Sequence, residues 1–410
     1  MPSFLLFLFF YFPFSWLTYS QSILIKSLRT YNSIDQTAAP IINMQDKNLS
    51  SLTIEFDVQS DYSPNLIINF KYCDQQWNPI ENIFLLNPGY NTAYNLWLES
   101  LPITVNGARY HYIGHFPNKD VTFPFSGKWK YFIYEQAGGN NVLATGRFVV
   151  INPQVNLHVS ISKDRLEGIA PDNSELGRAI DISTSFELPD SLFPENIMHL
   201  EIIENQKFDY PFIIKKEITN NRFYSWDGFS KFNFTIRDIL PGNNYRQVNL
   251  LDKNKYVPPL TNAHFERIET SDFYKFHHND FKGGSKLVNY KDDYAQYMNV
   301  VFKIRPLENI NSSIFLVGSF NNWQVLPSYM LSDDNGLMSI TIELKRGVYD
   351  YQYVTGIVSS DSVKDINWLT LEGNFWEAKH DYHVFLYYQS QNYGGYPTII
   401  GYSKITSGDL

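Results

Sequence analysis

Apolar and polar residues alternate in short runs along the chain, with a spacing typical of β-strands that are buried on one face. In the first part of the chain the runs are SLTIEFDVQ, LIINFKYC, KWKYFIYEQ and VLATGRFVVI. Turn-forming residues such as Asn87-Pro88-Gly89 separate them. The repeated order of strand, turn and strand predicts a β-sandwich over residues 21–152.

The same pattern continues to the end of the chain. Asn152-Pro153 marks a boundary, because proline cannot donate to a strand ladder. Residues 153–290 are expected to form a second sandwich; its part from Lys253 to Lys291 is polar and predicts a loop or edge hairpin followed by a linker. Residues 291–410 are expected to form a third, with a hairpin turn at Asn335-Gly336. The predicted fold class is all-β, with three consecutive immunoglobulin-like or early-set β-sandwich domains.

The first twenty residues are almost entirely apolar and uncharged. The run is too short to span a bilayer, and it suits a secretory signal peptide over residues 1–20 with cleavage after Ser20. No later segment is long and apolar enough to cross a membrane. Cys73 is the only cysteine, so no internal disulfide is expected, and its strand-like surroundings indicate a small buried group. We expect an exported protein without direct membrane insertion.

Composition narrows the function. The net charge of −9 argues against a nucleic-acid partner, which requires a basic surface. Aromatic residues make up 17% of the chain and charged residues only 18%, which favours packed sheets over disorder.

Sequence motifs for catalysis are absent: there is no nucleophile elbow, no H-E-x-x-H, no P-loop and no dinucleotide-binding motif. His277-His278 with Asp272 and Asp280 offers metal ligands, but a solvated loop is the simpler interpretation. We therefore predict no catalytic residue, no metal, no cofactor and no enzyme activity. A glycoside hydrolase is the enzymatic alternative, because carboxylates on distant strands leave no sequence signal.

Tryptophans are spread over all three segments. Trp129, inside a strand-like run, is expected in a core. Trp323 and Trp376 are flanked by Asn or Gly, and their sequence context leaves core and exposed positions open. An exposed tryptophan stacks on sugars or anchors a protein interface.

The motif GSFNNW, residues 318–323, followed by a turn and GVYDYQYVTG, resembles the carbohydrate-binding sandwich of glycogen-regulated kinase subunits and branching enzymes. In that family the motif tryptophan stacks on glucose, which would be the role of Trp323. Gln352 stands where the family has a lysine, and no second tryptophan follows at the expected interval. The candidate contacts for a partner or glycan are Phe320, Asn322 and Trp323.

A broader resemblance covers nearly the whole chain. The ordered segments SIDQTAAPII, FKYCDQQWNP, FPFSGKWKYFIYE, FTIRDILPGNNYR and YPTIIGYSKITS are similar to those of the plug protein of the type IX secretion translocon of Bacteroidota. The resemblance implies a periplasmic protein, peripheral to the outer membrane. It also implies a large outer-membrane β-barrel as partner, whose periplasmic end the plug seals when no substrate is exported.

Stacked sandwiches suit such a role, because close-packed interiors deform little and sealing needs no catalytic group. A polysaccharide-binding protein, acting through the third domain in the periplasm or at the cell surface, is the alternative that Trp323 leaves open.

Overall fold

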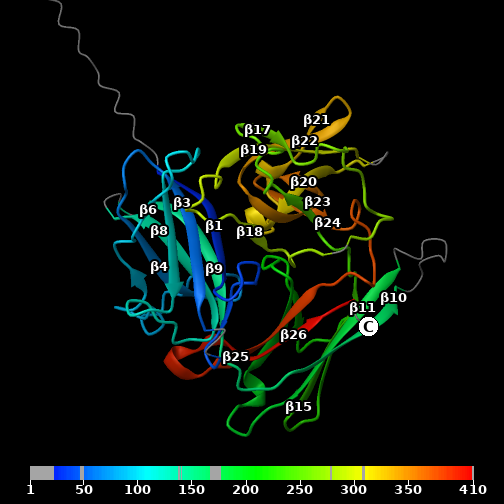
Figure 1. The fold of residues 1–410 in the computed structure, drawn as a ribbon. Helices are drawn as coiled ribbons and strands as arrows, with labels where there is room; N and C mark the ends of the chain where they lie inside the picture. The colour runs from blue at the N-terminus through cyan, green and yellow to red at the C-terminus, as the bar shows by residue number, and fades with distance from the viewer. Residues whose placement is uncertain are drawn as a thin grey trace, which may run out of the picture.

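The computed structural model describes residues 23–46, 50–136, 139, 141–166, 177–277, 279–306 and 310–408. Six β-sheets make up three lobes, so the all-β prediction is confirmed (Figure 1). Within these ranges the helical segments are four short 3-10 turns: η2 (Pro194–Asn196), η3 (Ser319–Asn321), η4 (Pro327–Tyr329) and η5 (Asn392–Gly394). The predicted signal peptide, residues 1–20, lies outside the described residues.

The first lobe packs two sheets around one core. Its sheets have the order β1-β3-β7-β6 and β2-β9-β8-β4-β5. The strands are β1 (Leu24–Asn32), β2 (Ile41–Asn43), β3 (Leu52–Gln59), β4 (Leu66–Cys73), β5 (Thr92–Ala93), β6 (Glu99–Ser100), β7 (Tyr110–Phe116), β8 (Gly127–Glu135) and β9 (Val142–Ile151). Trp129 is fully buried in this core, so its predicted position is confirmed.

The second lobe combines strands from two distant parts of the chain. Its sheets have the order β10-β11-β15-β14 and β13-β12-β25-β26. The strands are β10 (His158–Arg165), β11 (Arg178–Glu187), β12 (Ile197–Glu204), β13 (Phe212–Lys215), β14 (Arg222–Trp226), β15 (Lys231–Ile239), β25 (Asp381–Ser390) and β26 (Tyr396–Thr406). One core joins residues 155–239 with residues 382–400, and Trp376 packs half-buried against it.

The third lobe lies between these two parts in sequence. In one sheet β16, β18, β20 and β24 all pair with β23, and the other has the order β17-β19-β22-β21. The strands are β16 (Arg246–Asn249), β17 (Leu260–Asn262), β18 (Ser285–Leu287), β19 (Tyr297–Ile304), β20 (Ser313–Gly318), β21 (Ser332–Asp334), β22 (Leu337–Lys345), β23 (Gly347–Ser359) and β24 (Ser362–Asn367).

The sheets do not follow the expected boundaries 153–290 and 291–410. The third lobe is inserted into the second, because β12 pairs with β25 on one side and β13 on the other. The expected linker near residue 285 is β18, which pairs with β23. The hairpin turn at Asn335-Gly336 is confirmed, with positive φ angles of 55° and 83° between β21 and β22. The immunoglobulin-like and early-set types of the lobes stay a prediction.

Strand β3 shows how the lobes fit together. Its apolar residues, such as Ile54 and Phe56, point into the first lobe's core. The alternate residues Thr53, Glu55 and Asp57 are polar, and alternation alone would turn them to water. All three are nevertheless buried, and Asp57 bonds to residues of the third lobe. The polar face of this strand is therefore covered, and through Asp57 it contacts the third lobe.

Candidate functional site

Each pair of lobes is joined by a cluster of apolar side chains, and a buried charged side chain lies beside each cluster. We call these contacts the first–third, first–second and second–third junctions. At the first–third junction, the Asp57 carboxylate accepts hydrogen bonds from Lys345 Nζ at 2.7 Å and Tyr297 OH at 2.8 Å, and it contacts His111 Nδ1 at 2.6 Å. Asp57 and Lys345 are each 1% exposed. Burial alone would raise the pKa of Asp57, but the bond to His111 and the Lys345 charge lower it overall.

The first–second junction is built on a lysine and a glutamate. Lys128 of β8 donates to Glu201 of β12 at 3.0 Å and to the Gln75 carbonyl at 2.8 Å. Its ammonium also lies 4.9 Å from the centre of the Trp77 ring. Burial raises the pKa of Glu201, and the Lys128 charge opposes that rise. The pair is fixed between two sheets and is closed to solvent.

At the second–third junction, Lys207 of the second lobe lies among three aromatic rings from later parts of the chain. Lys207 Nζ donates to Glu204 at 2.8 Å, and Tyr245 OH donates to the same carboxylate at 3.2 Å. The ammonium is 4.4 Å from the Trp368 ring centre, 5.2 Å from Tyr245 and 5.9 Å from Trp323. Cation–π attraction of this kind is stronger away from water, and Lys207 is 7% exposed.

This junction explains where the predicted contact residues lie. Trp323 is 1% exposed, its ring is 4.2 Å from that of Tyr245, and its indole N–H donates to the Gly283 carbonyl at 2.8 Å. Of the two positions that the sequence left open for Trp323, the structure shows the core one, with Tyr245 and Gly283 against the ring. Phe320 packs half-buried against the third lobe's core, and Asn322 is exposed in a left-handed conformation. The three do not form one accessible surface.

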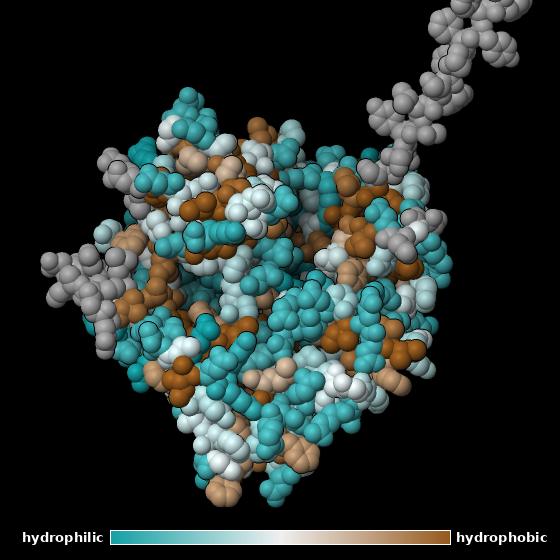
Figure 2. Space-filling model, turned by 180° about the vertical axis from the view of Figure 1, so that it is seen from behind, coloured by the Kyte–Doolittle hydropathy of each residue, from teal (hydrophilic) through white to brown (hydrophobic). Residues whose placement is uncertain are grey.

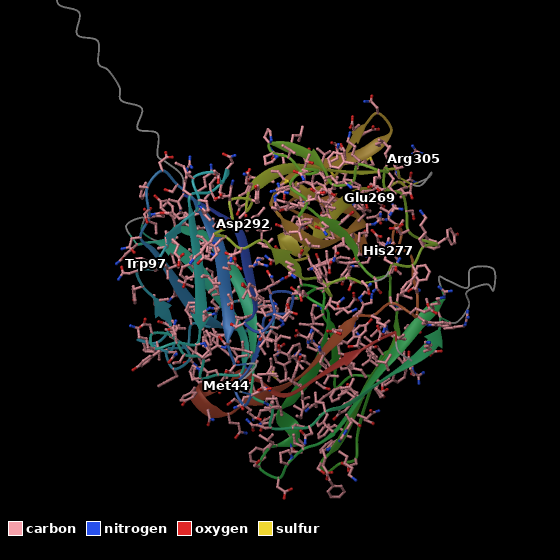
Figure 3. The ribbon with its side chains drawn as sticks, viewed as in Figure 1. Met44, Trp97, Glu269, His277, Asp292 and Arg305 are labelled. Carbon is pink, nitrogen blue, oxygen red and sulfur yellow. The ribbon has the colours of Figure 1, made fainter. Side chains whose placement is uncertain are left out.

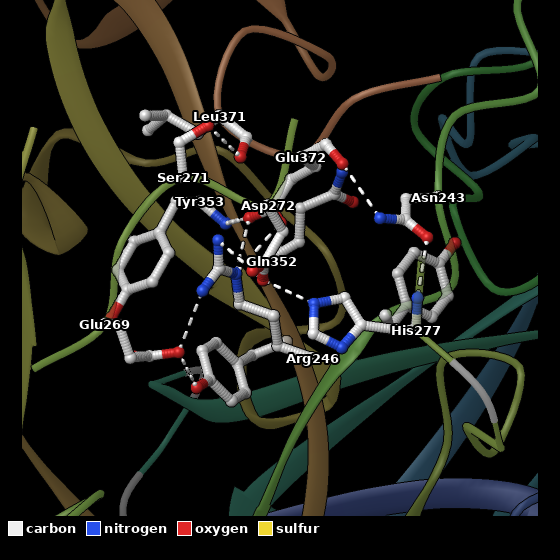
Figure 4. A network of polar contacts seen from close by, with 12 residues as sticks. Asn243, Arg246, Glu269, Ser271, Asp272, His277, Gln352, Tyr353, Leu371 and Glu372 are labelled. Atoms are coloured by element: carbon white, nitrogen blue, oxygen red, sulfur yellow. Dashed lines mark hydrogen bonds and ion pairs between the residues drawn. The ribbon is translucent and has the colours of Figure 1, made fainter. Parts of the chain in front are cut away.

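A separate network of hydrogen bonds and ion pairs, shown in Figure 4, lies where the chain enters and leaves the third lobe. Arg246, the first residue of β16, donates through Nε to Glu372 at 2.9 Å and through Nη1 to Glu269 at 3.0 Å. Its Nη2 lies 3.0 Å from Asp272. His277 in turn bonds to Asp272. Glu269 and His277 come from the stretch expected to be a loop or edge hairpin; the structure buries Glu269 and leaves His277 half-buried.

The electrostatics of this network depend on Arg246. Burial would lower the pKa of its guanidinium, but the carboxylates around it raise the pKa overall. Burial raises the pKa of Glu372 despite Arg246. Burial would also raise the pKa of Asp272, but the bond from His277 and the Arg246 charge lower it. One cation thus balances several acids, an arrangement that fixes structure.

All three lobes line a central cavity of about 240 Å³. Arg147 of the first lobe pairs with Asp209 of the second through two bonds of 2.5 Å, and Gln324 of the third donates to Asp209 at 3.0 Å. Seen from behind, the surface between the lobes is hollowed and largely hydrophilic (Figure 2). A single carboxylate therefore connects three lobes.

The structure also shows where Cys73 lies and whether the described residues include a metal-binding group or a membrane-spanning helix. Cys73 is buried, as expected, and burial raises the pKa of its thiol to about 12. In the described ranges no group of three or more His, Cys, Asp or Glu side chains is arranged to hold a metal ion. In the same ranges no helix has the length and apolar character needed to cross a membrane.

The structure resembles a solved one of unassigned function. A crystal structure of a hypothetical protein from Parabacteroides merdae ATCC 43184, at 2.30 Å resolution, matches 94% of this chain and 98% of its own with a TM-score of 0.74. The sequence identity is 19%, so the likeness concerns the fold alone. No curated protein matches the sequence.

A family model identifies the first lobe. Residues 25–152 match the model described as Type 9 secretion system plug protein 1st domain. The matched range begins within β1 and ends one residue after β9, so it coincides with the two sheets and the core of that lobe. The first lobe of this chain therefore belongs to the family of type 9 secretion system plug protein first domains.

Proposed function

We propose that the chain is a periplasmic plug, peripheral to the outer membrane, which binds the periplasmic end of the type 9 secretion translocon barrel. In this role it seals the pore when no substrate is being exported. The observation that carries the proposal is the family match of residues 25–152. The order of segments along the rest of the chain is consistent with the same family.

The geometry of the junctions supports a sealing role. A plug must resist deformation, and each pair of lobes is joined by packed apolar groups and a buried charged contact. Because every lobe contacts the other two, none can swing away without exposing one of these contacts to water. The body then acts by its shape, and the charged groups at the junctions are engaged with one another, not aimed at a substrate.

The proposal is tested in a native host that uses this secretion system. A tagged chain should recover the very large translocon barrel from solubilised outer membranes. Deletion of the gene should increase the uptake of small solutes through an otherwise intact translocon. Unchanged permeability together with no recovery of the barrel would refute the proposal.

The polysaccharide-binding alternative needs an aromatic ring that a sugar can reach. Trp323 is covered by Tyr245 and Lys207, so it offers no such platform in this structure. Calorimetry with α-glucans is the direct check, and binding that is lost in Trp323→Ala would revive the alternative. We therefore retain the plug as the single proposed function.

A further inference from the structure

Large apolar side chains are exposed in a concentrated stretch of the first lobe. We define the outer edge as residues 81–103. Six of its apolar or aromatic side chains are between 54 and 92% exposed: Ile83, Phe84, Tyr90, Tyr94, Trp97 and Ile103. Single exposed apolar residues are ordinary, but such a concentration indicates a surface that another molecule covers.

The outer edge forms one side of the first lobe's sandwich. It supplies β5 and β6, each of which is one of the two edge strands of its sheet. Figure 3 shows Trp97 at the outer side of this lobe, away from the second and third lobes. The exposed Trp97 ring therefore faces outward, where another molecule can cover it.

Both ends of the outer edge are fixed to the other lobes. Near one end, Asn82 donates to the Tyr393 carbonyl at 2.7 Å, and the rings of Phe84 and Tyr393 stack at 5.7 Å. Near the other end, Tyr290 OH donates to Glu99 at 3.0 Å. Because these anchors come from the second and third lobes, the edge moves with the whole body. A docking surface of this kind loses little conformational entropy on binding.

Charge distinguishes a protein partner from a lipid surface. The only charged residues of the outer edge itself are Glu81 and Glu99, and the one cation paired with it among the described residues is Lys291 of the third lobe, 3.4 Å from Glu99. An anionic membrane surface attracts basic segments, so this edge is poorly suited to it. Exposed Trp, Tyr and Ile without a basic cluster are instead suited to the pockets of a protein interface, where aromatic anchors carry much of the binding energy.

We propose that the outer edge is the surface by which this chain docks onto the periplasmic rim of the translocon barrel. The inference rests on the proposed function, and it adds which face of the molecule makes the contact. The edge belongs to residues 25–152, the part of the chain with the plug family match. Asparagines such as Asn91 and Asn95 interrupt the apolar side chains, so the contact remains partly polar and can be released when cargo arrives.

The test compares two charge-inserting variants in the native host. The edge variant carries Trp97→Glu and Ile103→Glu, at positions 79 and 92% exposed. The control carries Phe229→Glu and Ile218→Glu, at 81 and 69% exposed positions of the second lobe. Recovery of the translocon barrel by the tagged protein should fall at least tenfold for the edge variant and stay at the wild-type level for the control. Unfolding midpoints of both variants establish that they fold.

Each other outcome overturns a distinct claim. If the edge variant recovers the barrel as well as the wild type does, the docking surface is wrong and the plug function stands. If the wild type recovers no barrel, the proposed function fails and the docking surface fails with it. If light scattering finds a dimer of the purified chain that the edge variant disrupts, the edge joins two copies instead. Flotation of the wild type, but not the edge variant, with vesicles of outer-membrane lipids would assign the edge to a membrane.

Discussion

The junctions and the outer edge place charges and apolar groups in opposite environments. At the first–third junction, Asp57 and Lys345 are each 1% exposed, although charged side chains are almost never fully buried unless paired. Along the outer edge, Trp97 is 79% exposed and Ile103 is 92% exposed, although removing either side chain from water would lower the free energy.

The difference separates two tasks. A buried charge tolerates only the arrangement in which its partners surround it, so the junctions define the relative positions of the lobes at a cost in desolvation. An apolar group that stays mostly in water contributes little to the stability of the folded chain, and its burial can stabilise a complex. The interior charges thus shape the body, and the outer edge is available to a partner. The predictions below test this division.

The largest effect is expected for Arg246→Met. The substitution leaves Glu269, Asp272 and Glu372 facing one another without their cation, and removing one partner of a buried ion pair costs about 3–5 kcal/mol. Three acids are affected, so we expect a loss near the upper end of that range in urea-induced unfolding. Adding Glu372→Gln should recover part of it, because one uncompensated charge is removed.

Arg237→Met is the matched control. The Arg237 side chain is 53% exposed and lies 3.6 Å from Asp181, so its loss should cost less than about 1 kcal/mol. Equal costs for the two arginines would contradict the view that the buried network fixes the third lobe.

The next effect concerns the first–third junction. Lys345→Met should lower the unfolding free energy by about 3 kcal/mol, because Asp57 stays buried without its main cation. Tyr297 and His111 still contact the carboxylate, which limits the loss. The double variant Lys345→Met with Asp57→Asn should be more stable than the single one. A double variant that is less stable than Lys345→Met would show that the charge at Asp57 is not the cause.

The same junctions mark where sequence reasoning succeeded and where it stopped. Alternation in SLTIEFDVQ correctly predicts a strand with Ile54 and Phe56 in a core. It does not reveal that Asp57 is buried too, since a polar residue that faces another lobe and one that faces water give the same pattern. The partner Lys345 is 288 residues away, and a single sequence carries no signal for that pairing.

The order of strands shows a second limit. The run HDYHVFLYYQ has the apolar pattern of a strand and contains most of β25, yet its partner β12 lies before the third lobe. Local patterns define strands but not their neighbours, because pairing is decided by long-range packing. Likewise the motif GSFNNW does not show that Trp323 is buried, because that burial depends on Tyr245 and Lys207 outside the motif.

A pH-dependent effect is expected at Asp350. Its carboxyl accepts hydrogen bonds from the backbone N–H groups of Phe281 and Gly283 and from Gln247, and it lies in the buried face of β23. Burial, with the Asp280 charge, raises its pKa to about 7 from an ordinary value near 3.8. A raised pKa means that the folded state holds the proton more tightly, so this stabilisation is lost as pH rises through 7.

Asp350→Asn removes this titration and retains a similar shape. Between pH 5 and pH 8 the stability of the wild type should fall relative to the variant by up to about 3 kcal/mol, as each pKa unit corresponds to about 1.4 kcal/mol. Urea unfolding of both proteins at the two pH values measures the change. A constant difference between them would mean that Asp350 stays charged throughout this range.

The smallest effect should come from the outer edge, even with the most drastic change in chemistry. Trp97→Glu replaces a large ring by a charge, but that ring is already mostly in water, so the unfolding free energy should change by less than about 0.5 kcal/mol. Trp129→Ala, in the core of the same lobe, should cost about 3–5 kcal/mol. A large loss in Trp97→Glu would mean that the edge stabilises the lobe itself. In that case Trp97 would stabilise the fold as Trp129 does, and no binding partner would be needed to explain the exposed rings.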